Sequence, residues 1–489
     1  MAPHASPLGR SFVNGISLLG ANVVTSGAQY LIVVLAARAL GPETFGTYLF
    51  AFTFASFFAT ICNFGLDRVL IRELVHRPAG TSTNLLAAAA LRLLLGLLSL
   101  ALALVAAWWL GYRPELRLVI ALLLVSQILG LFSELVRSVL FAGGAMPREA
   151  KLRATGRLVA VVAVAGSLFM GWKIVGLAGA LGIGAFLELL LYAAAVARRG
   201  ALHRVQVEWD VAKDLARSAW PIAVHTALVV LYFRINIVML TSWAGPGAAG
   251  LFGVAFTFLQ VLQVVSGSAA GVILPTLTAR KMEGSDSVRS AVRTTTFYTL
   301  LFVLPTTVGM SLMAGDLVGV VYGSQYSGAV PALAVLVWAN PFMFLGSLYG
   351  TLLIVLNAER SLIPLSAAAL VVSGVANYLL VPSLGPVGAA WASVVTEGAV
   401  AAAAFWAVRS RLGRIGGGAV MLRPVMVAGA VAAALLGLRA ASAPWRALAG
   451  VLAFAAGAVA VDGVTADRAR VRLVMWRRGG IDAIVGRRR

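Results

Sequence analysis

Cysteine, histidine and charged residues are scarce in this chain of 489 residues, which has one cysteine and four histidines. Cys62 stands alone inside an apolar run, so we expect neither a disulfide framework nor a thiolate metal site. Charged residues make up 12% of the chain and hydrophobic residues 60%, and the mean hydropathy is +0.93. This composition excludes an ordinary soluble domain and predicts an all-α polytopic membrane protein that needs no cofactor.

The length fits about 12 to 14 membrane spans of about 20 residues each, joined by short loops. Apolar runs bounded by charges or by Gly and Pro predict six helices at 12–38, 46–64, 84–110, 116–143, 153–171 and 174–197. Six more are predicted at 215–243, 248–277, 292–314, 329–357, 362–381 and 386–408, and a last pair at 423–438 and 444–462. No small-residue cleavage site follows the polar stretch 1–11, so no removable signal peptide is expected.

One stretch occurs twice and indicates an internal duplication. The pattern GPxxxGx(aromatic)xxAFTF runs from Gly41 to Phe54 and again from Gly245 to Phe258, about 200 positions later. Each copy carries Gly-Pro between two apolar runs, a signal that ends one helix and begins the next. The duplication predicts two parallel repeats of about six helices, because equivalent points enter the membrane from the same face.

The repeats divide the chain into four expected parts. These are an N-terminal lobe at 1–200, a C-terminal lobe at 201–412, a helix pair at 413–465 and a basic cytoplasmic tail at 466–489.

Alternate connections differ in positive charge, although the net charge is +21 overall. One side is expected to carry about 30 of the 39 Lys and Arg residues, Arg157 among them. The other side carries only Arg38, Arg113, Arg117, Lys173, Arg439 and Arg446. The positive-inside rule therefore predicts that both termini are cytoplasmic. The charge indicates contact with membrane lipids rather than with nucleic acid.

Three segments carry a resemblance to a known family. Arg38–Tyr48, Phe64–Glu73 and Tyr232–Asn236 resemble the polysaccharide-transporter (Wzx-type) flippases, over essentially the whole chain. That family belongs to the multidrug/oligosaccharidyl-lipid/polysaccharide (MOP) flippase superfamily, which also holds the lipid II flippases and the MATE transporters. One departure is clear, because family members often carry Arg-x-Asp where this chain has Arg234-Ile235-Asn236.

The resemblance implies two MATE-like lobes that face a central cavity, not an enzyme. By alternating access they would move a polyprenyl-diphosphate-linked oligosaccharide from the cytoplasmic to the outer leaflet of the bacterial plasma membrane. The product would serve cell-surface polysaccharide biosynthesis. A polysaccharide polymerase and glycosyltransferases are the partners that such a role implies.

Moving a diphosphate and a glycan across hydrocarbon requires a wet, cationic path, so charges inside helices are the first candidates. Arg234 lies deep in the helix at 215–243, and its planar guanidinium suits phosphate oxygens. We predict that Arg234 faces a cavity, the alternative being a structural pair with a buried carboxylate or carbonyl. Asn236 is a second substrate-binding candidate, whereas His225 is expected to pack as an ordinary buried side chain.

The first repeat supplies further substrate-binding candidates. Arg92 has two open interpretations, one in which its long stem reaches the headgroups and one in which it contacts the entering diphosphate. Tyr30 occupies the repeat position of Arg234, with Gln29 beside it, so a neutral polar wall is expected opposite a cationic one. Glu134 and Arg137, three residues apart on a helix, predict an ion pair.

Glu188 and Glu397 lie at equivalent positions of the sixth and twelfth predicted helices, about 18 Å from the outer end. An unpaired carboxylate at that depth could exchange protons, which makes both candidates for ion coupling. In the alternative, each neutralises an arginine of its own lobe. Arg68 and Arg72 lie where a lipid-linked substrate would enter from the cytoplasm, and they are either interface anchors or recruitment sites, whereas Arg38 is expected to be an anchor at the outer face.

Three other functions remain open at this point. A MATE-type drug or cation antiporter would want acidic residues in its cavity, and a lipid II-type flippase would concentrate arginines in other helices. A membrane glycosyltransferase or polymerase would need carboxylates or histidines on a sizeable outer loop, and the expected outer connections are short.

Overall fold

The computed structural model describes residues 7–76, 81–142, 146–198, 208–413 and 419–463, and these ranges contain helices without any strand. The first half consists of α1 (Pro7–Asn63), α2 (Leu66–His76), α3 (Thr81–Trp109), α4 (Pro114–Ala142), α5 (Met146–Phe169) and α6 (Lys173–Ala197). The second half consists of α7 (Trp209–Met282), α8 (Ser285–Leu312), α9 (Ala314–Tyr322), the 3₁₀ turn η2 (Ser324–Ala329), α10 (Val330–Leu336), α11 (Ala339–Val355), the 3₁₀ turn η3 (Glu359–Ser361) and α12 (Leu362–Leu412). A last pair follows, α13 (Ala419–Gly437) and α14 (Ala443–Gly463).

Three of these helices are broken at a glycine that precedes a proline. Gly41 in α1 has φ 73° and ψ 169°, Gly245 in α7 has φ 85° and ψ 169°, and Gly385 in α12 has φ 53° and ψ −127°. A positive φ suits glycine because it has no Cβ, and the proline that follows is well placed to begin the next helix. The turns predicted from the repeated Gly-Pro are confirmed.

Nine described helices are long and apolar enough to cross a membrane, or ten if the bent pair Ser324–Leu336 and Ala339–Val355 counts as one span. The broken helices α1, α7 and α12 are among them. Helices suit lipid because they satisfy their own backbone hydrogen bonds. The protein is thus an all-α, multi-pass membrane protein as expected, whereas the total of 14 spans and the four-part division stay predictions.

Three expected connections or spans differ in the structure. The stretch after Phe64 forms the short amphipathic helix α2, which buries Leu66, Leu70 and Leu74 on one face. The helix expected at 329–357 is bent by 47° between α10 and α11. Helix α9 and the turn η2 lie before it, where only a short loop was expected. The spacing of Leu66, Leu70 and Leu74 was a helical signal for α2, whereas α9 and η2 are too short to show a helical period in the sequence.

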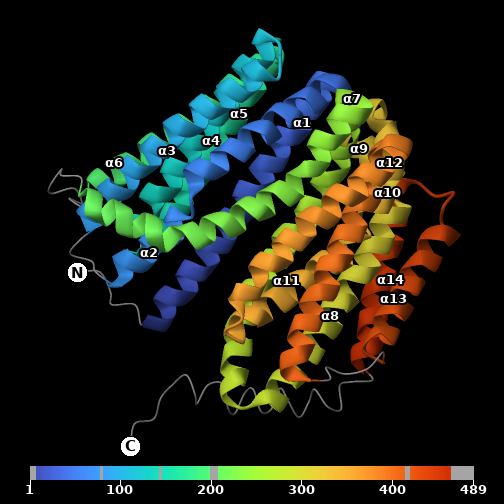
Figure 1. Ribbon diagram of the computed structural model, residues 1–489. Helices are drawn as coiled ribbons and strands as arrows, with labels where there is room; N and C mark the ends of the chain where they lie inside the picture. The colour runs from blue at the N-terminus through green and yellow to red at the C-terminus, as the bar shows by residue number, and fades with distance from the viewer. Residues whose placement is uncertain (1–6, 77–80, 143–145, 199–207, 414–418, 464–489) are drawn as a thin grey trace, which may run out of the picture.

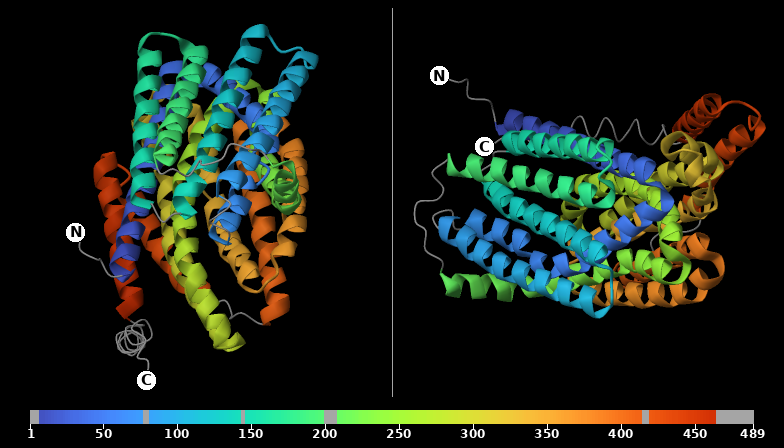
Figure 2. Two further views of the ribbon diagram at one scale, coloured as in Figure 1. Left: turned by 90° about the vertical axis from the view of Figure 1, so that its left-hand side faces the viewer. Right: turned by 90° about the horizontal axis from the view of Figure 1, so that it is seen from above.

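The helices of the two halves form two groups that converge where α1 and α7 bend (Figures 1 and 2). Helix α7 begins beside α2, where Ala212, Leu215 and Ala219 join the buried cluster of the first half, and then crosses to the second group (Figure 1). The largest buried cluster includes residues of both α1 and α7. These two helices therefore form the centre of the molecule.

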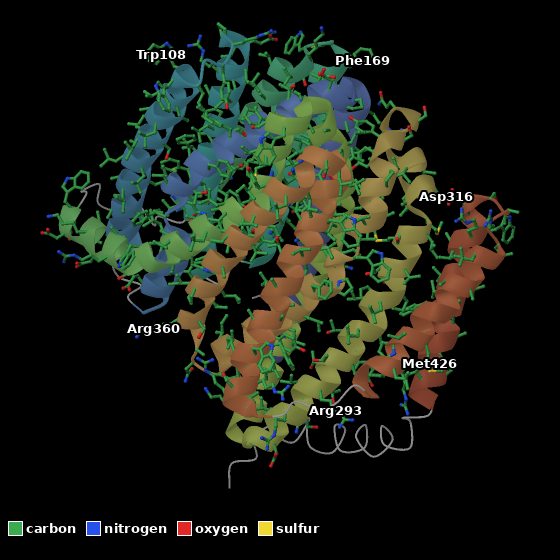
Figure 3. All side chains as sticks on the ribbon, turned by 45° about the vertical axis from the view of Figure 1, so that its right-hand side comes forward. Trp108, Phe169, Arg293, Asp316, Arg360 and Met426 are labelled. Carbon is green, nitrogen blue, oxygen red and sulfur yellow. The ribbon has the colours of Figure 1, made fainter. Side chains whose placement is uncertain are left out.

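The two ends of the bundle differ in their side chains. Figure 3 shows Trp108 and Phe169 at one end and Arg293 and Arg360 at the other. Trp108 and Phe169 are exposed, as expected for residues at a membrane–water interface. We call the two ends the Gly-Pro end, where α1, α7 and α12 break, and the basic end, where Arg293 and Arg360 lie.

The two copies of the Gly-Pro stretch pack against each other at the Gly-Pro end. A Cβ placed on Gly46 would lie 1.7 Å from the carbonyl oxygen of Pro246, and one on Gly250 would lie 2.0 Å from that of Pro42. The contact is reciprocal, since each helix presents a glycine to the backbone of the other. We call this contact the glycine seam. Only glycine fits here, because the two backbones touch directly.

A set of hydrogen bonds joins the halves beside the glycine seam. The Arg38 guanidinium donates to the carbonyl oxygens of Val320 (2.6 Å) and Val321 (2.7 Å) at the end of α9. The Tyr326 hydroxyl donates to the Ala37 carbonyl at 2.8 Å, and the Gln325 amide donates to that of Arg38 at 3.1 Å. Arg38 therefore binds the other half of the protein, in contrast to the expected role of a simple interface anchor.

The last helix pair lies on the outer flank of the second half. Helix α13 packs against α8 and α14. Arg446 of α14 forms an ion pair with Asp316 of α9 at 2.6 Å and donates to the Leu312 carbonyl at 3.3 Å. Asp316 and Arg446 stand about 130 residues apart in the sequence, so no local sequence pattern predicts that α14 is attached to α9.

We expect Gly46→Ala to separate α1 from α7, because the new methyl group would overlap the Pro246 carbonyl. Overpacking of this kind costs about 1–3 kcal/mol. The measurement is the unfolding midpoint of the purified protein in detergent, which should fall for Gly46→Ala. Gly27→Ala in the same helix is the matched control, since nothing lies within 4 Å of a Cβ there. Equal midpoints for the two variants would contradict a tight seam.

Candidate functional site

A polar cavity lies between the two halves. One part, of ≈ 530 Å³, is lined mainly by α1 and α7, and an adjoining part of ≈ 440 Å³ extends among α1, α4, α5 and α6. Gln29, Tyr48, Phe52, Arg157 and Arg234 line both parts. Leu49 and Gly253 line the larger part and lie one helical turn from the glycine seam, so the seam bounds the cavity at the Gly-Pro end.

Arg234 enters this cavity from α7, as the sequence predicts. Its guanidinium lies over the Phe52 ring of α1, with 5.1 Å between the guanidinium carbon and the ring centroid. This cation–π contact joins the two halves across the cavity. In the part of the chain that the structure describes, no Asp or Glu forms an ion pair with Arg234. Its positive charge is therefore not balanced by a carboxylate of the described residues.

The structure brings Gln29 and Tyr30 together with Arg234. All three line the larger part of the cavity, where Gln260 and Gln263 of α7 add two more amide side chains. Tyr30 comes from the position of α1 that corresponds to Arg234 in α7. Uncharged polar groups of α1 thus face a cation of α7, which is the arrangement that the repeat comparison predicts.

Arg157 is a cavity residue that sequence reasoning missed. It was placed among the positive charges of the cytoplasmic side, but the structure puts its side chain, 38% exposed, at both parts of the cavity. Its Nε lies 3.9 Å from Oε2 of Glu188, an ion pair too long for a hydrogen bond. Glu188 therefore has a partner in its own half. The sequence does show a charge one turn into the predicted helix. It does not show which side of that helix faces the cavity.

Arg92 lies in neither part of the cavity and is fully buried. Its guanidinium forms an ion pair with Asp67 at 2.9 Å and donates to the carbonyl oxygens of Leu131 and Asn63. The side chain therefore does not reach the headgroups, and its two terminal nitrogens donate to groups of α1, α2 and α4. Both sequence-based interpretations of Arg92 are replaced by a structural role, because Asp67 stands on a helix that the sequence analysis did not predict.

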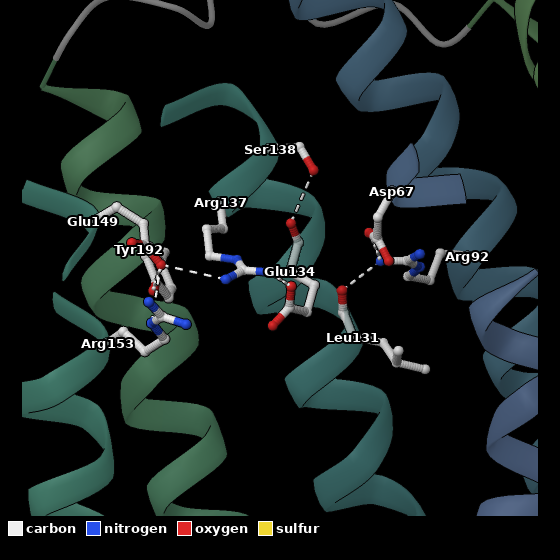
Figure 4. A network of polar contacts seen from close by, with 9 residues as sticks. All are labelled: Asp67, Arg92, Leu131, Glu134, Arg137, Ser138, Glu149, Arg153 and Tyr192. Carbon is white, nitrogen blue, oxygen red and sulfur yellow. Dashed lines mark hydrogen bonds and ion pairs between the residues drawn. The ribbon is translucent and has the colours of Figure 1, made fainter. Parts of the chain in front are cut away.

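A second set of ionic contacts lies beside the first in the same half of the protein (Figure 4). Arg137 pairs with Glu134, as the sequence predicts, and with the buried Glu149 at 3.4 Å. Glu149 also pairs with Arg153 at 3.2 Å and accepts a hydrogen bond from Tyr192. Helices α4, α5 and α6 are linked by these contacts, in which each described carboxylate has an arginine partner.

Asn236 belongs to a buried cluster and does not line the cavity. Its amide nitrogen donates to the Ser393 hydroxyl at 2.9 Å, and its oxygen accepts from Asn377 at 2.6 Å and Ser373 at 3.3 Å. The cluster joins α7 to both segments of α12. Asn236 therefore positions the helix that carries Arg234, and we do not retain it among the groups that meet a ligand.

Glu397 lies in a separate cavity of ≈ 380 Å³ inside the second half. Tyr232, His225 and Ser366 line the same space as Glu397. His225 Nδ1 lies 3.3 Å from Ser366 Oγ, so His225 faces a cavity rather than simply filling the core. The structure thus separates Glu397 from Glu188. The side chains of Arg68 and Arg72 lie outside the described part of the chain.

The fold, with its charged cavity between two repeated halves, defines a polytopic membrane protein with a MATE-like fold. The solved lipid II flippase MurJ, in an inward closed conformation, is similar with a TM-score of 0.76 over 92% of this chain and 98% of that chain, at 12% identity. An inward-facing MATE-family multidrug transporter of the MOP superfamily is similar with a TM-score of 0.67 over 81% and 98%, at 16% identity. At these identities the likeness concerns the fold alone.

The sequence itself matches the family described as Polysaccharide biosynthesis protein over residues 11–280, and the chain belongs to that family. The succinoglycan biosynthesis transport protein ExoT of Rhizobium meliloti (strain 1021) is 28% identical over 324 residues. That match covers 64% of this chain and 62% of the relative's length. The family match confirms the Wzx-type resemblance, and the relatives and neighbours that the chain matches are transporters and flippases.

We expect Arg92→Ala to destabilise the first half. The change leaves the Asp67 carboxylate without its ion-pair partner, and it removes the donor to the carbonyl oxygens of Leu131 and Asn63. Breaking a buried ion pair costs about 3–5 kcal/mol. The unfolding midpoint in detergent should fall strongly for Arg92→Ala and hardly at all for Arg280→Ala, whose pair with Glu283 is exposed. A stable Arg92→Ala protein that has lost transport would instead indicate a direct role in binding.

Proposed function

We propose that this flippase moves a polyprenyl-diphosphate-linked oligosaccharide across the bacterial plasma membrane for cell-surface polysaccharide biosynthesis. The direction is from the leaflet at the basic end, which is cytoplasmic, to the leaflet at the Gly-Pro end. Both chain termini are then cytoplasmic, and a polymerase and glycosyltransferases act on the same material. Family membership supports the transport of polysaccharide precursors.

The observation that carries this proposal is the uncompensated charge of Arg234 in the cavity. The two carboxylates that line the cavity are each paired with an arginine, Glu134 with Arg137 and Glu188 with Arg157. Among the described residues, Arg234 is the cavity charge that lacks an opposite partner. An anionic head group fits such a cavity, because a guanidinium binds phosphate oxygens through charge-assisted hydrogen bonds.

The rest of the cavity suits the polar glycan of the same substrate. Gln29, Tyr30, Gln260 and Gln263 offer donors and acceptors to sugar hydroxyls, and Phe52 and Phe233 provide apolar surface. The polyprenyl tail need not enter, since it is as apolar as the lipid around it. A cationic drug, the cargo of a MATE-type antiporter, would meet Arg234 without a free carboxylate beside it. A lipid II-type substrate also carries a diphosphate, so it differs from the proposed substrate in its glycan.

The test is flipping of a polyprenyl-diphosphate-linked oligosaccharide in liposomes that contain the purified protein. Arg234→Ala should weaken substrate binding about tenfold to a hundredfold, which corresponds to one or two charge-assisted hydrogen bonds. Arg234→Lys should restore part of the loss, since lysine keeps the charge without the planar fork. The initial flipping rate at several substrate concentrations separates binding from turnover.

Arg217→Ala is the matched control on the same helix, because Arg217 is 81% exposed and pairs with Asp214 near the start of α7. The same oligosaccharide on a lipid without diphosphate should not be moved. Unchanged flipping by Arg234→Ala would remove the proposed role of Arg234. Extrusion of cationic dyes without movement of any lipid-linked oligosaccharide would favour the antiporter instead.

A further inference from the structure

The two equivalent carboxylates of the repeats lie in different surroundings. Glu188 is 12% exposed, and Arg157 stands beside it as a cationic partner. Glu397 is 7% exposed, and no Arg or Lys whose side chain the structure describes forms an ion pair with it. Tyr232, whose hydroxyl is uncharged, lines the same cavity. One copy of the repeat holds a compensated charge and the other a buried, uncompensated one.

Comparing the repeats position by position explains this difference. The spacing that separates Glu188 from Glu397 also separates Arg157 from Ser366, so the second copy has a serine where the first has the arginine partner. The spacing that relates Tyr30 to Arg234 relates Ala28 to Tyr232. The second copy has therefore lost a cation and gained a hydroxyl. Both changes act on the same carboxylate.

The surroundings of Glu397 contain few other ionisable groups. Helix α7 presents Tyr232 and His225 to the cavity, and the first segment of α12 presents Ser366, which contacts His225. Helix α11 contributes Met343, Gly346, Ser347 and Gly350, none of which titrates. Glu188, by contrast, has Arg157 and Arg153 on α5 and Glu134 and Arg137 on α4 in its electrostatic surroundings, with Tyr192 on its own helix.

We propose that the Glu397 cavity is the proton site that couples transport to a pH gradient, and that the Arg157–Glu188 pair is not. A carboxylate buried without a cation is costly when charged, and binding one proton removes that charge. The proton comes from water when the cavity is open to one face and leaves to water at the other face. A single site of this kind carries one proton per transport cycle. This inference rests on the proposed function for the identity of the cargo.

Helix α7 provides the route from the proton to the cargo. Tyr232, which lines the Glu397 cavity, stands two residues before Arg234, which faces the larger cavity between the halves. The same segment is held to α12, where Asn236 donates to Ser393, four residues before Glu397. When Glu397 is charged, it can accept a hydrogen bond from the Tyr232 hydroxyl in the same cavity. A protonated Glu397 can itself donate, which reverses the hydrogen bond next to Arg234.

The experiment compares Glu397→Gln with Glu188→Gln in liposomes under an imposed pH gradient. With one proton per cycle, a gradient of one pH unit changes the steady-state ratio of the oligosaccharide lipid between the leaflets by up to about tenfold. We expect wild type and Glu188→Gln to keep this response and Glu397→Gln to lose it while still exchanging the lipid. A response that survives in Glu397→Gln, or that follows a Na⁺ gradient instead of pH, would overturn the proposal.

A second readout does not depend on the cargo. Infrared difference spectra of the purified protein between acid and alkaline pH should show a carboxyl band that Glu397→Gln removes and Glu188→Gln keeps. Loss of the band only in Glu188→Gln would refute the assignment even if no tested lipid is moved. If the band assigns to Glu397 but no lipid-linked oligosaccharide is flipped, the proposed function fails and the proton site stands. Unfolding midpoints confirm that both variants fold.

Discussion

The contact on which the rest of this structure depends is the reciprocal packing of two glycines, Gly46 and Gly250, against the turns Gly245-Pro246 and Gly41-Pro42. Backbone touches backbone here, and no side chain lies between the two helices to absorb a change. Because α1 and α7 are fixed at this end, their divergence sets the width of the cavity that begins one turn away. In a transporter that alternates between faces, this seam and the Arg38 contacts beside it must part when the Gly-Pro end opens.

Charge balance divides the buried polar groups into those that hold the bundle and those that remain for ligands. Arg92, Arg137 and Arg153 have carboxylate partners and hold the helices of the first half together. Arg234 has an aromatic ring as its partner, and Glu397 shares its cavity with the uncharged Tyr232. Charges without opposite partners are costly in a membrane and persist where they serve a function. Both of these groups belong to the second half, which therefore carries the chemistry of the two proposals.

Much of the fold could be predicted from the sequence, because its signals are local. Apolar runs indicate spans, and Gly-Pro at 41, 245 and 385 indicates breaks, since glycine alone tolerates the required φ. The partners of charged residues could not be predicted, because they depend on how each helix is rotated about its axis. Arg92 meets Asp67 and Arg157 meets Glu188 across helices that no local pattern relates. Arg234 was predictable because any charge at that depth needs a cavity or a partner.

The duplication explains why the halves share a frame and yet differ in chemistry. The glycine seam needs the same residues in both copies, since each copy is the packing surface of the other, and here the sequences agree. No such reciprocity constrains the cavity walls, and here the two copies differ. The position of Arg234 in the second copy is held by Tyr30 in the first, and the position of Arg157 in the first copy is held by Ser366 in the second. Two identical cationic walls would repel each other across the cavity, and two uncompensated carboxylates would double the charge to be neutralised in each cycle. In the two proposals, divergence at these positions leaves one cation for the cargo and one carboxylate for the proton, on the helix pair α7 and α12.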